Sequence, residues 1–324
     1  MESAGINSPP KVSVIMPSYM TAHLIAGSLD SVLQQTFRDF EIIVVNDGSP
    51  DTGELERILA PYREKIVYTK QENKRAAGAR NTAIGQARAE FLAFLDSDDT
   101  WLPDHLASQM RLFEQDPTLD LVYCDGMLDT PEWSRKFTDI CPSHGPATFD
   151  ALVVERCQIP VSTVIARKGA LAKAGFFDES LPRCDDYDMW LRAAFWGAKI
   201  GYSKNIGARF TANRPGSLGV SRIKMSEAYW KILQKALETL PLNDSQNALV
   251  QRRTAEARAH YLLEVGKDHF REGRLTEAME SLSESNTHFH NAKLTLVLLG
   301  LKVAPNATRK LISFAESVRN GVQS

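Results

Sequence analysis

Three carboxylates stand within four residues, directly after a strongly apolar stretch. The apolar stretch is Phe91–Leu95, and Asp96-Ser97-Asp98-Asp99 follows it. Five consecutive apolar residues between polar segments are typical of a strand that is buried on both faces. Unpaired carboxylates this close repel one another, and a hard divalent cation such as Mn²⁺ or Mg²⁺ would relieve the repulsion. The pattern therefore indicates a metal–diphosphate site at the end of a central strand.

A structural interpretation of the same four residues is equally open. Asp99 or Thr100 would then be the N-cap of a helix that begins near Trp101, and the acidic turn would only cap that helix. The four residues alone do not choose between a metal site and a cap, so the rest of the chain has to decide.

Strands and helices are expected to alternate through the first part of the chain. Apolar runs predict strands, and apolar residues at helical spacing predict helices between them. The expected strands cover residues 12–16, 41–45, 66–68, 91–95 and 119–124, and the expected helices cover 24–33, 55–59, 76–87 and 101–114. This alternation predicts an α/β fold of βαβ units with a mainly parallel sheet flanked by helices.

Polar clusters follow three of these expected strands. The clusters are Pro17-Ser18-Tyr19, Asn46-Asp47-Gly48-Ser49 and Asp96-Ser97-Asp98-Asp99. Ligands of open α/β sheets bind beyond the carboxyl ends of the strands, so we expect the clusters to converge on one rim. This convergence favours the metal site over the cap. A further acidic pair, Asp185-Asp186, stands at the expected start of a later helix.

Composition and charge exclude some classes of function. The chain has 324 residues, of which 43% are hydrophobic and 24% charged, and its formal net charge is −2. This charge gives no electrostatic basis for nucleic acid as the main partner. The four cysteines are widely spaced, which argues against a zinc site and fits a reducing cytosol. We expect a cytoplasmic protein, with peripheral binding at the inner face of the membrane left open.

Residues 221–324 are expected to form a helical region that follows a larger domain at 11–220. The spacing of Leu262, Gly266 and Phe270 resembles one tetratricopeptide-type hairpin. Such an appendage would pack on the larger domain or serve as the surface for a homodimer or another partner. The apolar run Leu294–Leu301 is too short to cross a bilayer. We interpret it as a buried helix, with a membrane-surface anchor as the alternative.

Taken in this order, the motifs resemble the inverting GT-A glycosyltransferases of glycosyltransferase family 2. The resemblance covers about residues 11–220 and rests on Pro-Ser-Tyr, Asn-Asp-Gly-Ser, Ala-Arg-Asn, Asp-Ser-Asp-Asp and a later Asp-Asp before Trp-Leu-Arg. It implies a GT-A fold and a nucleotide-diphosphate-sugar donor, with a UDP-sugar favoured. It also implies a Mn²⁺ or Mg²⁺ ion and a saccharide, lipid-linked or protein-linked acceptor.

The resemblance assigns roles to individual residues. The positions that match the donor site are Pro17, Ser18, Tyr19, Asp47, Asn73, Arg80, Asp96, Ser97, Asp98 and Arg214. Within this set, Asp47 matches the carboxylate that binds the base, and Asp96 and Asp98 match the metal-binding motif. Asp186 matches the general base. Structural alternatives are an N-cap for Asp186, a turn former for Asp47 and a core aromatic for Tyr19.

Three positions depart from the family pattern. Arg75 replaces a usual glycine, and Asp185 replaces the glutamate of the Glu-Asp pair, so its side chain is one methylene shorter. Arg209 competes with Arg214 for the contact with the diphosphate. The shorter Asp185 leaves the reach of a second carboxylate contact open, but it does not affect the assignment of Asp186.

The function implied is inverting transfer of a sugar to an acceptor hydroxyl in polysaccharide, glycolipid or glycoprotein synthesis. A carboxylate takes the proton of the acceptor, and a metal stabilises the charge on the departing diphosphate. A nucleotidyltransferase and a non-catalytic scaffold are the alternatives. A nucleotidyltransferase would carry a Gly-rich basic loop where Pro17–Met20 stands, and the intact acidic residues argue against a scaffold.

Overall fold

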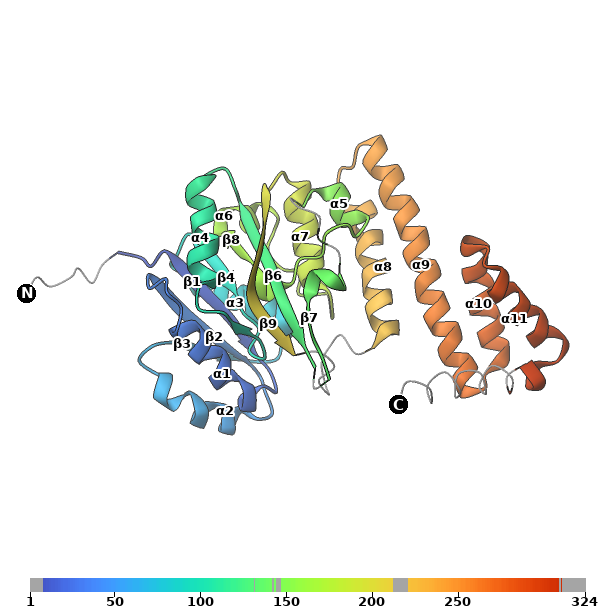
Figure 1. Ribbon diagram of the computed structural model, residues 1–324, viewed down its shortest axis with the longest axis horizontal. Coiled ribbons are helices and arrows are strands. Elements are labelled where there is room, and N and C mark those ends of the chain that lie inside the picture. Colours follow the sequence, from blue (N-terminus) through green and yellow to red (C-terminus); the bar gives the residue numbers. More distant parts are fainter. Residues whose placement is uncertain are drawn as a thin grey trace, which may run out of the picture. The chain divides into compact units, whose positions relative to one another are not determined.

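The chain forms two compact units, residues 1–217 and 218–324. The structure is a computed structural model, and it describes residues 8–130, 132–141, 143, 147–211, 221–308 and 310. The first unit is a sheet with helices packed on it, and the second is helical (Figure 1).

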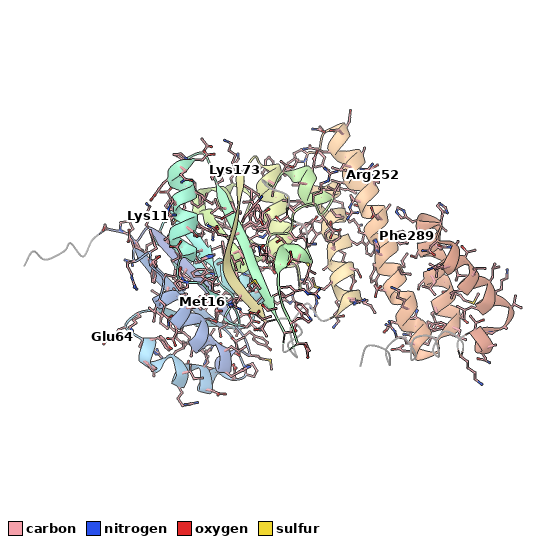
Figure 2. The ribbon with its side chains drawn as sticks, viewed as in Figure 1. Lys11, Met16, Glu64, Lys173, Arg252 and Phe289 are labelled. Atoms are coloured by element: carbon pink, nitrogen blue, oxygen red, sulfur yellow. The ribbon has the colours of Figure 1, made fainter. Side chains whose placement is uncertain are left out.

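One half of the sheet is parallel and has the strand order β3-β2-β1-β4. Its strands are β1 (Val12–Ser18), β2 (Phe40–Asp47), β3 (Val67–Gln71) and β4 (Phe91–Phe94), and its helices are α1 (Ala22–Leu33), α2 (Thr52–Leu59) and α3 (Arg75–Gln86). Met16 of β1 is fully buried, whereas Lys11 and Glu64 lie on the outside (Figure 2). The apolar runs of the sequence therefore form the centre of the sheet, as predicted.

The other half of the sheet is mixed and follows the order β8-β6-β9-β5. Its strands are β5 (Thr100–Trp101), β6 (Leu121–Asp129), β7 (Ser134–Lys136), β8 (Ile165–Arg167) and β9 (Ile200–Thr211), and its helices are α4 (His105–Gln115), α5 (Phe149–Val153), α6 (Lys168–Lys173) and α7 (Asp185–Phe195). β8 joins the halves because it pairs antiparallel with both β4 and β6. The parallel pair of β6 and β9 completes this half.

The helix expected from Trp101 begins instead at His105. Trp101 belongs to β5 and pairs with Ala208 of β9, and its indole ring stacks on His105 at a centroid distance of 4.3 Å. The N-cap of α4 is Asp104. The interpretation of the acidic turn as a helix cap, with Asp99 or Thr100 as the N-cap, is therefore wrong.

In the second unit each described helix packs against the next one in the chain, and the last three of them enclose a small core. Its helices are α8 (Arg222–Thr239), α9 (Asp244–Glu272), α10 (Leu275–Phe289) and α11 (Ala292–Val303). Gly273 ends α9 with φ +81°, which permits the tight turn into α10. A Cβ on Gly266 would lie 2.6 Å from Cγ of Leu282, so the hairpin needs glycine at this crossing. The tetratricopeptide resemblance stays a prediction.

The prediction of a helix over Leu294–Leu301 is confirmed, but the expectation that this helix is buried is wrong. These residues belong to α11, in which only Leu301 is buried, whereas Leu296 and Leu299 are 68% and 54% exposed. One face of α11 packs on the core formed with Phe270 and Ala278, and the opposite face does not. Among the described residues, no helix is both long and apolar enough to cross a bilayer.

Candidate active site

The carboxyl ends of three parallel strands meet at one edge of the sheet. Ser18 at the end of β1 pairs with Asn46 of β2. Ile15 of β1 pairs with Phe94 at the end of β4, just before the acidic residues. The three polar clusters of the sequence therefore lie along one rim, as the parallel arrangement predicts.

The acidic loop after β4 brings three carboxylates together. Oxygen atoms of Asp96, Asp98 and Asp99 all lie within 4.8 Å of one another, and all three side chains are partly exposed. The backbone N–H of Asp99 donates to the carbonyl of Asp96 at 3.0 Å, which curls the loop on itself. Carboxylate oxygens are the ligands that Mg²⁺ and Mn²⁺ prefer, so this donor set fits a hard divalent cation. The sequence interpretation named only Asp96 and Asp98.

Hydroxyl groups fix the acidic loop on both sides. Ser162 Oγ accepts from the backbone N–H of Asp96 at 3.1 Å and donates to a carboxylate oxygen of Asp99 at 2.6 Å. On the other side, Ser97 Oγ lies 2.7 Å from Oγ1 of Thr21. Sequence reasoning missed Ser162, because a single serine distant in the chain carries no motif.

Arg80 lies buried behind the acidic loop and joins it to α7. Its Nη2 donates to Asp96 at 2.7 Å, and its Nη1 donates to Asp185 at 2.6 Å. Burial alone would lower the pKa of Arg80, but the carboxylates of Asp96, Asp185 and Asp186 outweigh it and raise the pKa. The guanidinium therefore stays charged and holds the two acidic motifs together.

Asp186 lies in the first turn of α7 beside this cluster. One of its oxygens accepts the backbone N–H of Tyr187 at 2.8 Å, and the side chain is partly exposed. Burial, followed by the carboxylate of Asp185, raises its pKa to about 6, while Arg80 and the Tyr187 N–H oppose the rise. Asp96 also contributes to the rise. Asp186 is therefore a stronger proton acceptor than an ordinary aspartate.

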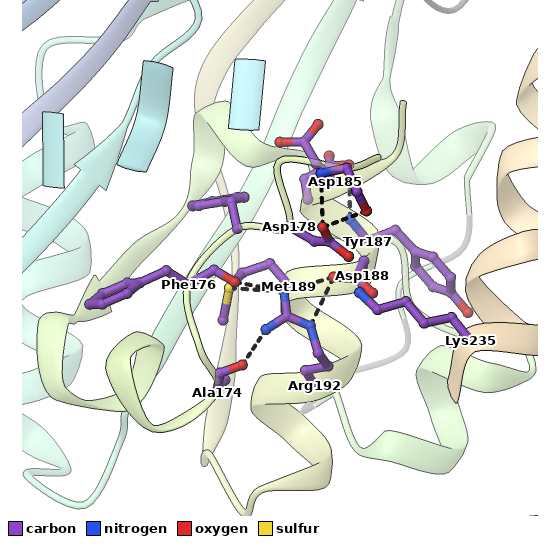
Figure 3. Close-up of polar contacts among 12 residues, drawn as sticks. Ala174, Phe176, Asp178, Asp185, Tyr187, Asp188, Met189, Arg192 and Lys235 are labelled. Atoms are coloured by element: carbon purple, nitrogen blue, oxygen red, sulfur yellow. Dashed lines mark hydrogen bonds and ion pairs between the residues drawn. The ribbon is translucent and has the colours of Figure 1, made fainter. Parts of the chain in front are cut away.

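Asp188, two residues further along α7, has a structural role. Arg192 donates through Nε to Asp188 at 2.8 Å and through Nη2 to the carbonyl of Phe176 at 2.7 Å (Figure 3). The same guanidinium donates to the carbonyl of Ala174. Asp188 is buried, so this pair anchors the loop before α7 to the helix.

Asp47 lies buried at the end of β2 with one oxygen engaged. Its Oδ1 accepts from Gln71 Nε2 at 2.7 Å and from the backbone N–H of Lys74 at 2.8 Å. Within the described part of the chain, no hydrogen bond reaches Oδ2. Gly48 follows with φ +64°, and a Cβ there would lie 2.7 Å from the backbone nitrogen of Asn73. The Asn73 segment therefore passes so close to Gly48 that no side chain fits there.

The other described residues that we expect to bind the sugar donor lie along the same rim. Pro17, next to last in β1, lies opposite Val45, and Tyr19 just after the strand is 47% exposed, which excludes a core aromatic. Asn73 is exposed and donates to the carbonyl of Asp47 at 3.0 Å. Arg214 lies outside the described residues. Arg209 forms an ion pair with Asp129 at 2.9 Å.

Comparison with known proteins identifies the family. A family model described as glycosyl transferase family 2 matches residues 13–158. The Escherichia coli protein WfgD, a UDP-Glc:alpha-D-GlcNAc-diphosphoundecaprenol beta-1,3-glucosyltransferase, is 43% identical over 181 residues, which are 56% of this chain and 68% of WfgD. The chain belongs to glycosyl transferase family 2. An uncharacterized glycosyltransferase of Rickettsia prowazekii, RP339, is 31% identical over 70% of this chain and 73% of its own length.

Other relatives are longer than this chain. The matches span 31% and 33% of two uncharacterized glycosyltransferases, from Rickettsia felis and Rickettsia conorii. Among solved structures, S. aureus TarS 1-349 in complex with UDP-GlcNAc has a TM-score of 0.61 at 20% identity, covering 96% of this chain and 92% of that one. PcManGT from Pyrobaculum calidifontis, in complex with GDP-Man and Mn²⁺, has a TM-score of 0.62 at 17% identity, covering 96% and 81%. The predicted GT-A fold with a C-terminal helical segment is thereby confirmed.

Proposed function

We propose that this family 2 glycosyltransferase is metal-dependent and inverting, and that it moves a sugar from a UDP-sugar to a hydroxyl of a lipid-linked saccharide. One observation carries the proposal: a single guanidinium, that of Arg80, donates to Asp96 of the acidic loop and to Asp185, the residue before Asp186. WfgD, whose name gives UDP-Glc and a diphosphoundecaprenol acceptor, and the UDP-GlcNAc complex of TarS support the choice of donor and acceptor.

A Mn²⁺ or Mg²⁺ ion fits the acidic loop because the ligands that the loop offers are carboxylate oxygens. Asp98 would hold the ion together with Asp96 or Asp99. When bound, such an ion stabilises the negative charge that develops on a departing diphosphate. The Mn²⁺ complex of PcManGT supports this assignment.

The other roles in the reaction are assigned to residues of this chain. Asp186 takes the proton of the acceptor hydroxyl, and its raised pKa leaves it ionised at neutral pH but more basic than usual. Asp47 accepts the imino N–H of the uracil base through Oδ2. Arg80 positions Asp185 and Asp96, and does not contact the donor, because it is buried behind them. All these residues lie in 11–220, so we assign the reaction to this part of the chain.

A thermal-shift panel with Mn²⁺ and UDP-Glc, UDP-GlcNAc or GDP-Man tests the proposal. A ligand that binds only the folded state raises the melting temperature by mass action. We expect the UDP-sugars to raise it, the Asp98→Asn variant to lose the rise and the Asp186→Asn variant to keep it. A rise that is independent of both Mn²⁺ and Asp98 would contradict the metal assignment.

A further inference from the structure

Helix α11 presents a row of exposed apolar side chains on its outer face. Ala292, Leu296, Leu299 and Val303 are spaced i, i+4, i+7 and i+11, which places them on one side of an α-helix. Leu296, Leu299 and Val303 are 68%, 54% and 83% exposed. They are three of the eight large apolar side chains that are exposed among the described residues. We call these four residues the α11 stripe.

The α11 stripe is additional to the face that α11 uses for folding. Val297 and Leu301 point to the opposite side and pack on the core that contains Phe270 and Ala278. Removing the stripe should therefore leave the helix in place. Exposing four aligned apolar residues costs solvation free energy without stabilising this core, which indicates that they bury against something else.

Lysines flank the α11 stripe, and α11 contains no acidic residue. Lys293 follows Ala292 and Lys302 precedes Val303, so each lysine lies about 100° around the helix from the stripe, on opposite sides. Both side chains are exposed. An apolar row between two cationic edges complements a surface that is apolar inside and anionic at its rim. A second copy fits poorly, because α11 has no carboxylate with which the lysines of another stripe could pair.

We propose that the α11 stripe docks on an anionic lipid bilayer. The apolar side chains enter the boundary between headgroups and acyl chains, while Lys293 and Lys302 extend to the lipid phosphates. The helix has 12 residues, so it lies in the interface and does not cross the bilayer. The proposal goes beyond glycosyl transfer, since it concerns where the enzyme resides. It would place the enzyme on the surface that holds a lipid-linked acceptor.

Sedimentation of the full chain with vesicles tests this proposal without donor or acceptor. We expect binding to vesicles of 70% phosphatidylcholine and 30% phosphatidylglycerol, and much weaker binding to pure phosphatidylcholine. Changing both Lys293 and Lys302 to Gln should weaken binding about 25-fold, since each lysine near an anionic surface contributes about fivefold. The double variant Leu296→Ser/Leu299→Ser should lose more than tenfold. Val67→Ser, which removes an exposed valine from the first unit, is the matched control and should bind as the unchanged chain does.

Several results would overturn the docking surface. The proposal is wrong if the full chain does not bind the anionic vesicles, if it binds neutral vesicles equally well, or if the leucine variant binds as well as the unchanged chain. A dimer in solution that the leucine variant dissociates would assign the stripe to a second copy instead. Circular dichroism checks whether each variant is folded. A chain that binds vesicles but transfers no sugar would leave this surface intact and overturn the proposed function.

Discussion

Asp96 and Asp185 accept hydrogen bonds from the same guanidinium, that of Arg80, at 2.7 and 2.6 Å. Asp96 lies in the loop after the central strand β4 and Asp185 begins α7, so the buried cation fixes the geometry between the two acidic motifs. Without it, their carboxylates would repel one another in a poorly solvated place. The catalytic proposal depends on this link, because the base and the metal ligands have to keep a fixed position relative to each other.

The stability of the fold should depend strongly on Arg80. Arg80→Met leaves two carboxylates without their counter-charge, and we expect a loss of about 3 kcal/mol or more in the free energy of unfolding. Arg57→Met is the control, because Arg57 also pairs with a carboxylate, Glu54, and both of these side chains are exposed. Its loss should cost about 1 kcal/mol or less. Urea denaturation measures both, and equal losses would contradict the role of Arg80.

Asp186→Asn should stabilise the metal-free protein at pH 8. The pKa of Asp186 is raised to about 6 in the fold from an ordinary value near 3.8, so its ionisation above pH 6 opposes folding. Asparagine removes that charge, and we expect a gain of roughly 1–3 kcal/mol. Below the folded pKa, at pH 5, the native carboxyl is mostly protonated and the gain should shrink. A gain that is the same at both pH values would mean that the charge of Asp186 is not its cause.

Ser162→Ala should weaken binding of Mn²⁺ and UDP while the fold persists. The hydroxyl of Ser162 links the Asp96 backbone to the Asp99 carboxylate, and loss of such an outer contact typically costs about 10–100-fold in metal affinity. Thr163→Ala removes the neighbouring buried hydroxyl, which donates to the carbonyl of Pro160 and does not touch the acidic loop. Calorimetric titration should show the loss in the first variant only. Similar affinities in both variants would exclude a role for Ser162.

Asp47→Ala should weaken UDP binding about 10–100-fold, as expected for the loss of a hydrogen bond to a charged group. Binding of Mn²⁺ alone should not change, because Asp47 belongs to β2 and not to the acidic loop. Titration with UDP and with inorganic pyrophosphate separates the two contributions. If pyrophosphate binding fell as much as UDP binding, Asp47 would not be a base contact.

The parallel half of the sheet and its rim were predictable because they depend on local patterns. A run such as Phe91–Leu95 is shielded from water only if other elements cover both faces of its strand. Asp96 then lies just beyond the end of that strand. The mixed half depends on long-range pairing. β5 has only two residues, Thr100–Trp101, and its pairing with β9 has no periodic signal, so the start of α4 was misplaced.

The contacts behind the site could not be predicted for the same reason. Arg80 and Asp185 are far apart in the chain, and only the packing of α3 against α7 brings them together. The exposure of one face of α11 could not be predicted from the sequence either. A helix with apolar residues on two opposite faces has the composition of a buried one, so the sequence could not indicate that only one of these faces is covered.

The transfer rate of Asp186→Asn tests the central claim most directly. The measurement is a single-turnover assay with saturating UDP-sugar, Mn²⁺ and a GlcNAc-diphosphate-lipid acceptor, compared with the unchanged enzyme. If Asp186 is the general base, the rate should fall about 10²–10⁴-fold while the affinity for UDP is retained. An Asp186→Asn variant that transfers sugar at the normal rate would contradict the account.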